Sequence, residues 1–126
     1  MRTFFVYILA SKKKGTLYTG VTDNLLRRMI EHKEKLNISF SSKYGIDKLV
    51  YFETYKYADE AIRREKNIKK WKRDWKIELI EMNNKEWKDL FYDIAGEYEI
   101  MEMRKYLKEK YKEHGFPLDP KGTPRE

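Results

Sequence analysis

The pattern of apolar and polar positions divides the chain into three extended segments separated by helical ones. Apolar, aromatic and β-branched residues run almost without interruption over 3–10 and 48–55, and a shorter run covers 16–21. Runs of this length and composition predict buried strands. A polar turn over 12–15, ending in glycine, separates the first two runs. These two strands are therefore expected to form a hairpin.

Helical patterns fill most of the remaining chain. Thr22 or Asp23 is suited to cap the first helix, the Asn83-Asn84 pair to end the second, and Gly96 to stop the third. The segment 114–126 contains all three prolines and is expected to be disordered. Helices are predicted over four ranges: 24–36, 59–82, 87–94 and 97–113.

The resulting order is β-β-α-β-α-α plus a C-terminal helix. It lacks the regular strand–helix alternation of a doubly wound fold. We therefore expect an α/β protein of the α+β type, with a small sheet packed against helices. Large apolar residues become sparse after Gly96. This change predicts a folded domain over 1–95, followed over 96–126 by a charged helix and a disordered tail.

Composition narrows the possible functions. The 126 residues carry a net charge of +7 and include no cysteine. A basic protein attracts polyanions, while the absence of cysteine excludes disulfides and thiolate zinc sites. No apolar stretch reaches the length of a membrane span, and the apolar start is not preceded by the positive charges of a signal peptide. A cytoplasmic protein without a membrane partner is expected.

Positive charge is concentrated in one predicted helix. Residues 63–76 contain eight Lys or Arg and two acidic residues, interleaved with Trp71 and Trp75. This pattern is typical of a surface that contacts a phosphate backbone, although a solvated helix face is the alternative. The expected nucleic-acid contacts, including the hairpin turn, are Lys12, Lys13, Lys14, Arg63, Lys66, Lys69, Lys70, Lys72 and Arg73.

Two polar residues interrupt the apolar stripe of the first predicted helix. At about 100° per residue, Arg28 and His32 fall within the stripe formed by Leu25, Met29 and Leu36. An arginine facing a core needs an anionic or hydrogen-bonding partner. The alternatives are an arginine that extends to water and a histidine satisfied within the core.

The long predicted helix has a similar interruption. Glu65 lies about 40° from the centre of its expected buried side. A partly buried carboxylate needs a cation, which is either a metal ion or an ion-pair partner such as Arg28 or a nearby lysine. The expected buried side consists of Ala61, Ile62, Ile68, Trp75 and Leu79, with Trp71 on its flank.

Taken in order, these residues resemble the motifs of the GIY-YIG nuclease superfamily, particularly its small stand-alone bacterial UPF0213 branch. The resemblance covers residues 1 to about 92. Its first motif lacks the usual glycine, and Thr19 replaces isoleucine in the second. The matching positions are Phe5-Val6-Tyr7, Tyr18-Thr19-Gly20, Arg28, His32, Glu65 and Asn84.

The resemblance implies a three-stranded antiparallel sheet flanked by helices and a metal-dependent DNA endonuclease. Glu65 would be the single protein ligand of Mg²⁺ or Mn²⁺. Arg28 would bind the scissile phosphate, and Tyr7 or Tyr18 would position and deprotonate the attacking water. Structured or branched DNA in repair or recombination is the implied substrate, with RNA and a protein partner left open.

Two further positions would support the chemistry: His32 would assist proton transfer and Asn84 would brace the site. All these side chains must converge on one pocket for the nuclease function to hold. Two other functions remain open. A nucleic-acid-binding module without turnover needs only the basic segment, and an interaction module would use the helix over 97–113.

Overall fold

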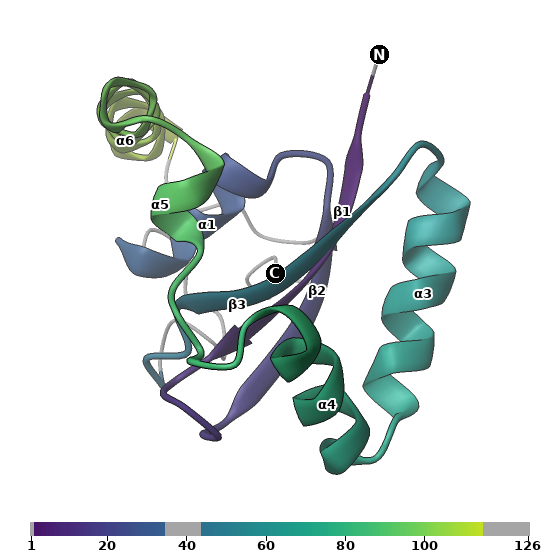
Figure 1. Cartoon of the computed structure of the whole chain (residues 1–126). Helices are drawn as coiled ribbons and strands as arrows, with labels where there is room; N and C mark the ends of the chain where they lie inside the picture. Colours follow the sequence, from purple (N-terminus) through teal and green to yellow (C-terminus); the bar gives the residue numbers. More distant parts are fainter. Residues whose placement is uncertain (1, 35–43, 115–126) are drawn as a thin grey trace.

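Strand β1 (Phe4–Ala10) lies at the centre of a three-stranded antiparallel sheet. Its neighbours are β2 (Leu17–Thr22) and β3 (Lys48–Tyr55), in the order β2-β1-β3. The computed structural model describes residues 2–34 and 44–114, with helices on both faces of the sheet (Figure 1). The expected α+β fold and the predicted hairpin are confirmed.

Both faces of the sheet are buried, which explains the uninterrupted apolar run in β1. Successive side chains of a strand point to opposite faces. Val6, Ile8 and Ala10 belong to one core cluster, whereas Tyr7 and Leu9 belong to another. A strand covered on both sides does not show the alternating pattern of a half-exposed strand.

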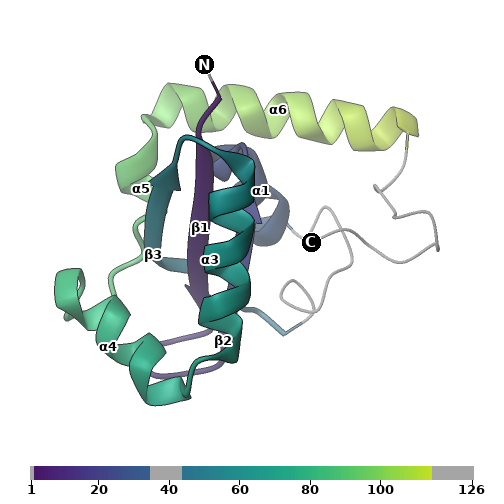
Figure 2. The same cartoon turned by 90° about the vertical axis from the view of Figure 1, so that its right-hand side faces the viewer.

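The helices divide between the two faces (Figures 1 and 2). The face that carries Tyr7 is covered by α1 (Leu25–Lys33), α5 (Phe91–Ile94) and α6 (Glu97–His114). The opposite face is covered by α3 (Ala58–Lys70) and α4 (Arg73–Asn83). Within the described ranges, no helix is long and apolar enough to cross a membrane.

Helix α1 begins one residue later than expected because Asn24 is its N-cap. The Asn24 side chain accepts a hydrogen bond from the Arg27 amide at 3.1 Å, satisfying an otherwise unpaired helix donor. Thr22 holds the N-cap residue itself, because its hydroxyl oxygen accepts a hydrogen bond from the Asn24 amide at 3.1 Å. The end of the predicted helix, at 35–36, lies outside the described residues.

The prediction of one long helix over 59–82 is wrong. Trp71 and Lys72 have extended backbones and separate α3 from α4. The break allows Arg73 Nη2 to donate to the carbonyls of Lys14 at 2.5 Å and Gly15 at 2.7 Å, which fastens α4 to the hairpin turn. Neither glycine nor proline marks the break, so local sequence does not indicate it.

The break also changes which residues are buried. Trp75 and Ile62 were expected on the buried side but are 51% and 42% exposed. The predicted helical phase does not continue through the extended residues, and α4 instead places Ile77 and Ile80 in the core cluster. On α3 the buried stripe is narrow, so Ile62, next to Ala61, lies outside it.

The predicted helix over 87–94 is shorter than expected and is confined to α5. Trp87 has a positive φ of 57° and is buried, with Nε1 donating to Glu81 Oε2 at 2.7 Å. This backbone conformation prevents a helix from starting there.

The last predicted helix is present as α6, and its Ile100 and Leu107 join the core cluster that contains Tyr7. The division of the chain near Gly96 remains a prediction, and the predicted disordered tail beyond 114 lies outside the described residues.

Candidate active site

Three rings from three different elements gather on the α1 side of the sheet. Tyr7 of β1, Tyr18 of β2 and His32 of α1 have ring centroids 5.8–6.3 Å apart. Tyr7 and His32 are each only 1% exposed, whereas Tyr18 is partly exposed. Strand pairing therefore brings together the two predicted tyrosines, and α1 adds the predicted histidine.

Gly20 makes room for Tyr7 at the edge of the sheet. The two residues are direct cross-strand partners, and the Tyr7 ring lies over the glycine. A Cβ placed on Gly20 would lie 3.0 Å from Tyr7 Cε1 and still closer to Cζ and Oη. The phenol thus extends across β2 toward its outer edge, which requires a residue without a side chain.

Gly20→Ala is expected to lower the free energy of unfolding by about 1–3 kcal/mol, because the buried ring must move to accommodate the methyl group. Urea unfolding at neutral pH measures this change. Gly96→Ala is the matched control, since its added Cβ would meet only Glu99 Oε1 at an ordinary 3.5 Å. Equal stability of the two variants would contradict the close packing of Tyr7 on Gly20.

His32 is uncharged in this environment. Burial, reinforced by the nearby charge of Arg28, lowers the pKa of His32 to about 3. The imidazole is therefore neutral at physiological pH. It can orient a neighbouring group by hydrogen bonding but is a weak base in the folded protein.

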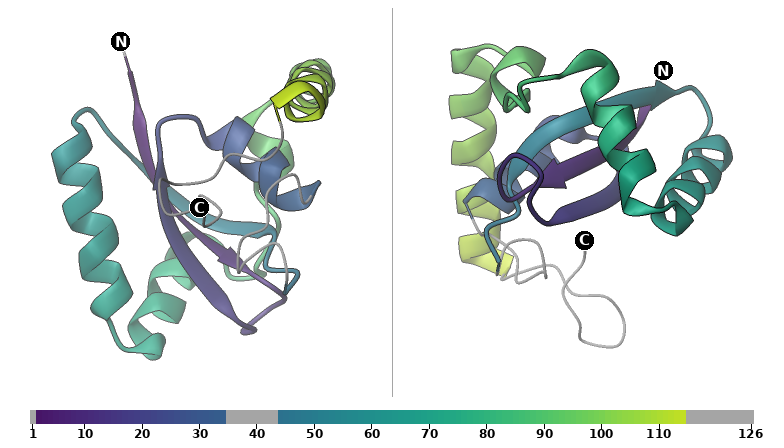
Figure 3. Two further views of the ribbon diagram at one scale, coloured as in Figure 1. Left: turned by 180° about the vertical axis from the view of Figure 1, so that it is seen from behind. Right: turned by 60° about the horizontal axis from the view of Figure 1, so that its bottom comes forward.

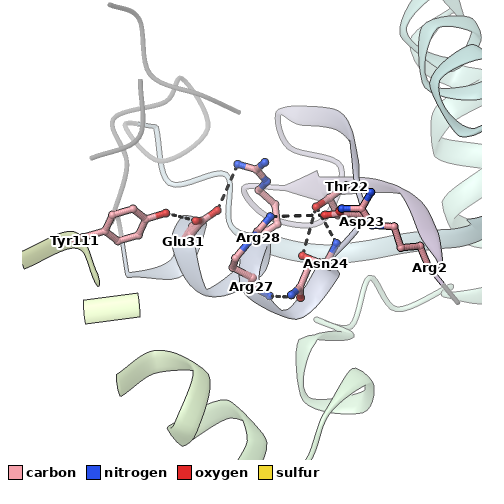
Figure 4. A network of polar contacts seen from close by, with 8 residues as sticks. All are labelled: Arg2, Thr22, Asp23, Asn24, Arg27, Arg28, Glu31 and Tyr111. Atoms are coloured by element: carbon pink, nitrogen blue, oxygen red, sulfur yellow. Dashed lines mark hydrogen bonds and ion pairs between the residues drawn. The ribbon is translucent and has the colours of Figure 1, made fainter. Parts of the chain in front are cut away.

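Arg28 is part of a buried ion pair that reaches α6 (Figure 4). Its Nη1 lies 3.3 Å from Glu31 Oε1, and the Tyr111 hydroxyl donates to Glu31 Oε2. The two side chains of the ion pair are 14% and 5% exposed. Arg28 Nε is buried and has no hydrogen-bond partner among residues 2–34 and 44–114.

Glu65 faces the sheet from α3. It is 9% exposed, and Lys69 Nζ lies 2.7 Å from its Oε2. This lysine is one of the partners that the sequence left open.

Arg64, the residue before Glu65, ties α3 to strand β3. Arg64 Nε bonds Glu53 Oε1 of β3 at 2.6 Å. A helix turns by about 100° per residue, so Glu65 does not share the direction of Arg64 toward β3, and α3 also packs along β1 and β2.

The edge of β2 is the place where these side chains can share a ligand. Helices α1 and α3 lie on opposite faces, on either side of this strand (Figure 3, left). The rings and Arg28 lie on the α1 side of the sheet, and Glu65 lies on the α3 side. Their convergence on one substrate at this edge stays a prediction.

Asn84 lies at the β3 edge of the sheet, away from β2. Its Nδ2 donates to the carbonyls of Val50 at 3.0 Å and Lys88 at 2.9 Å, and its Oδ1 accepts from the Lys88 amide at 2.9 Å. Val50 belongs to β3, the strand farthest from β2. Asn84 therefore braces the connection after α4 rather than joining the three rings.

The predicted nucleic-acid contacts form an exposed basic surface around α3 and the hairpin turn. Arg73 links these two regions through its bonds to the turn carbonyls. Glu65 lies beside this surface through its ion pair with Lys69. All nine predicted residues are exposed: Lys12, Lys13, Lys14, Arg63, Lys66, Lys69, Lys70, Lys72 and Arg73.

The residues fit a lightly held divalent ion. Within the described ranges, no group of three or more His, Cys, Asp or Glu gathers to form a protein cage. Mg²⁺ commonly binds through one or two carboxylates while keeping water and substrate phosphate as its other ligands. Glu65, a largely buried carboxylate beside a basic surface, suits this mode of binding.

Sequence reasoning did not identify Glu31 or Tyr111. Glu31 is only 4% exposed, and its position three residues after Arg28 is a local signal for an ion pair. Tyr111 lies 80 residues from Glu31, so no local pattern connects the two.

The fold and the tyrosine–histidine–arginine cluster define a small α+β domain of the nuclease type. Residues 3–78 match the GIY-YIG catalytic domain, and the chain belongs to this family. The resemblance seen in the sequence is confirmed. GIY-YIG proteins form a nuclease family that generally uses divalent metal ions and acts on nucleic acid.

The chain is similar to small bacterial UPF0213 proteins. It is 42% identical over 76 residues to one from Clostridium perfringens, covering 60% of this chain and 81% of that protein. It is 35% identical to one from Staphylococcus epidermidis, covering 64% of this chain and 98% of that protein. The solution NMR structure of a Bacillus halodurans UPF0213 protein is 27% identical, with a TM-score of 0.42, covering 79% of this chain and 93% of that one.

Proposed function

We propose that this protein is a divalent-metal-dependent endonuclease that hydrolyses DNA phosphodiester bonds at the edge of β2. One observation supports the proposal most strongly: two tyrosines and a neutral histidine gather near Arg28, while Glu65 on α3 lies beside the basic surface. Family membership supports the reaction class. We place its work in the repair or recombination of structured DNA in the cytoplasm, by analogy with the family.

Each residue has a distinct role in this reaction. Glu65 would hold Mg²⁺ or Mn²⁺, which when bound supplies an activated water and offsets charge on the leaving oxygen. Arg28 would bind the scissile phosphate through its planar fork of donors. Tyr7 or Tyr18 would position the attacking water and, as its phenolate, accept the proton. A phenol ordinarily ionises at about pH 10, so Arg28 or the bound metal would have to favour the ionised form. The neutral His32 would orient the phenols.

Metal-dependent cleavage is the primary test. Supercoiled plasmid and a forked oligonucleotide duplex are incubated with Mg²⁺, Mn²⁺ or EDTA. Nicking with either metal but not with EDTA is the expected result. DNA binding without cleavage under all three conditions would overturn the proposal.

The second candidate is a nucleic-acid-binding module without turnover. Two ion pairs favour it, since Lys69 already neutralises Glu65 and Glu31 already neutralises Arg28. Such a module would retain the basic surface around α3, and metal would change neither its affinity for DNA nor the integrity of the DNA.

Arg28→Lys is expected to reduce cleavage by about 10²-fold or more while DNA affinity changes by less than about threefold. Lysine retains a charge for Glu31 but loses the planar fork that matches phosphate. The basic surface supplies most of the binding energy. Single-turnover cleavage and fluorescence anisotropy in EDTA measure the two quantities.

Arg27→Lys is the matched control, because Arg27 occupies the same helix and pairs with Asp23 at 3.6 Å. It should leave both cleavage and binding close to wild type. Equal losses of cleavage and affinity in the Arg28 variant would contradict a role confined to the transition state.

A further inference from the structure

The corner between α3 and α4 exposes an aromatic surface that the proposed cleavage site does not use. Trp75 is 51% exposed, and its ring centroid lies 6.2 Å from that of Trp71 in an edge-to-face arrangement. Leu79 and Met82 continue the same side of α4. We call these four residues the Trp75 stripe. Together with Glu78 they line a shallow hollow of about 460 Å³.

The two tryptophans differ in their surroundings. Trp71 is covered by the Arg64 guanidinium, whose Cζ lies 5.0 Å from the ring centroid. Ile77 and Ile80 pack on the sheet, and Trp75 projects from the other side of α4. Half the surface of its large ring remains accessible. An exposed tryptophan of this kind is typical of a binding surface.

Lysines lie beside the Trp75 ring, together with two acidic residues: Asp74 precedes it in sequence and Glu78 lines the same hollow. Lys72 Nζ lies 5.9 Å from the ring centroid, and Lys76 Nζ donates to the Lys69 carbonyl at 3.4 Å. Burial, together with the nearby charges of Arg73 and Lys69, lowers the pKa of Lys76, which shows how closely these cations are placed. Over 69–78, five Lys or Arg outnumber two acidic residues, and this net positive charge favours a polyanion over an apolar protein helix.

The same corner joins the basic hairpin turn. Arg73 fastens the carbonyls of Lys14 and Gly15 to the start of α4, and the turn and α4 lie at the same end of the molecule (Figures 1 and 3). Nucleic acid crossing this end would contact both elements. Aromatic rings within a basic surface are the common means of binding unpaired nucleotides, since a base stacks on the ring while cations hold its phosphate.

We propose that Trp75 stacks an unpaired base of a DNA strand whose phosphates contact Lys72 and Lys76. The proposal rests on the proposed nuclease function and names its substrate class as DNA with a single-stranded arm. Lys69 connects the two sites, because it pairs with Glu65 and its carbonyl accepts from Lys76. A base held at Trp75 would therefore place the adjoining single-strand to duplex junction near Glu65.

The test measures binding to two DNA probes in EDTA, where no cleavage occurs. One is a duplex with two unpaired oligo-dT arms, and the other is a blunt duplex of equal length. Trp75→Ala should weaken binding to the forked probe about tenfold and to the blunt probe less than twofold. Trp75→Phe should restore most of the loss. Titration with oligo-dT should quench the tryptophan fluorescence of the wild type more than that of Trp75→Phe.

Met82→Ala is the matched control, since Met82 is 76% exposed on the same stripe but offers no ring. It should leave the preference for the forked probe unchanged. Equal losses on both probes in the Trp75→Ala variant, or no loss on either, would overturn the proposal. Sedimentation tests whether the Trp75 stripe is instead a contact between two copies of the chain. If Trp75→Ala and Met82→Ala both change the oligomeric state while the preference for the forked probe is intact, the stacking proposal is overturned.

The outcome is separable from that of the nuclease assay. Fork-selective binding that depends on Trp75, without any metal-dependent cleavage, would support the stacking site and reject the nuclease. Metal-dependent cleavage with a Trp75→Ala variant that binds both probes normally would support the nuclease and reject the stacking site.

Discussion

Replacing Glu65 with Gln is expected to reduce metal-dependent DNA cleavage by about a thousandfold, the scale of loss when charge stabilisation is removed from a transition state. Glutamine has nearly the same shape but lacks the charge needed to hold a divalent cation. Among the residues that the structure describes, no group of three or more acidic or histidine ligands is present to substitute for the lost carboxylate. Affinity for DNA in EDTA should be equal to or slightly above that of wild type.

The fold should tolerate this change. Glu65 pairs with Lys69, whose side chain is 51% exposed, and ion pairs with such an exposed partner contribute about 0.2–1 kcal/mol. Single-turnover cleavage gives the rate, and Mn²⁺ binding followed by electron paramagnetic resonance gives an independent readout of the ion. Glu60→Gln on the first turn of α3 is the matched control. Wild-type cleavage by the Glu65 variant would remove the proposed metal ligand from the mechanism.

The second large effect concerns stability in acid. The pKa of His32 is lowered to about 3 in the folded protein, by burial and then by Arg28, whereas the unfolded chain titrates near 6.5. Between these values the unfolded state binds the extra proton. The contribution of neutral His32 to the free energy of unfolding is therefore complete above about pH 6.5 and is lost as the pH falls toward 3. The maximum slope is about 1.4 kcal/mol per pH unit, or about 3 kcal/mol by pH 4.5.

Urea unfolding at several pH values between 4.5 and 7 measures this slope. His32→Gln should make the curve shallower by nearly the full contribution, whatever its effect on stability at pH 7. Carboxylates of the unfolded chain begin to titrate at the acid end of this window, and they contribute to wild type and variant alike. The only other histidine is His114, and His114→Gln should leave the slope unchanged. Identical slopes in wild type and His32→Gln would show that His32 becomes charged in the folded protein.

Part of this chain has no counterpart in its short relatives. The match to the Staphylococcus epidermidis protein covers 98% of that protein but 64% of this chain, so about a third of the chain has no counterpart there. Helix α6 lies after the matched family domain and contributes Leu107 to the core and Tyr111 to Glu31. It also pairs Arg104 with Glu34 at 2.5 Å. The helix therefore braces α1, the element that carries Arg28 and His32.

Local pattern was sufficient to predict the three strands, the hairpin, and the burial of His32 and Glu65. Each of these depends on residues a few positions apart, whose periodicity determines which side of an element is apolar. Local pattern was insufficient at Trp71 and Lys72. There the chain leaves the helix, and the break allows Arg73 to bind carbonyls of a turn almost sixty residues earlier, a contact with no local signature.

The sequence by itself therefore determined the three strands, the burial of β1 and the chemical types of the candidate residues, but not the break between α3 and α4. Tertiary structure alone decided that Tyr111 binds Glu31, the partner of Arg28, and that Asn84 braces β3 away from the three rings. It also placed Glu65 on α3, across the sheet from those rings. The reason is physical. Periodicity gives the direction of a side chain about the axis of its own helix or strand, whereas strand order and helix packing decide which distant groups that side chain meets.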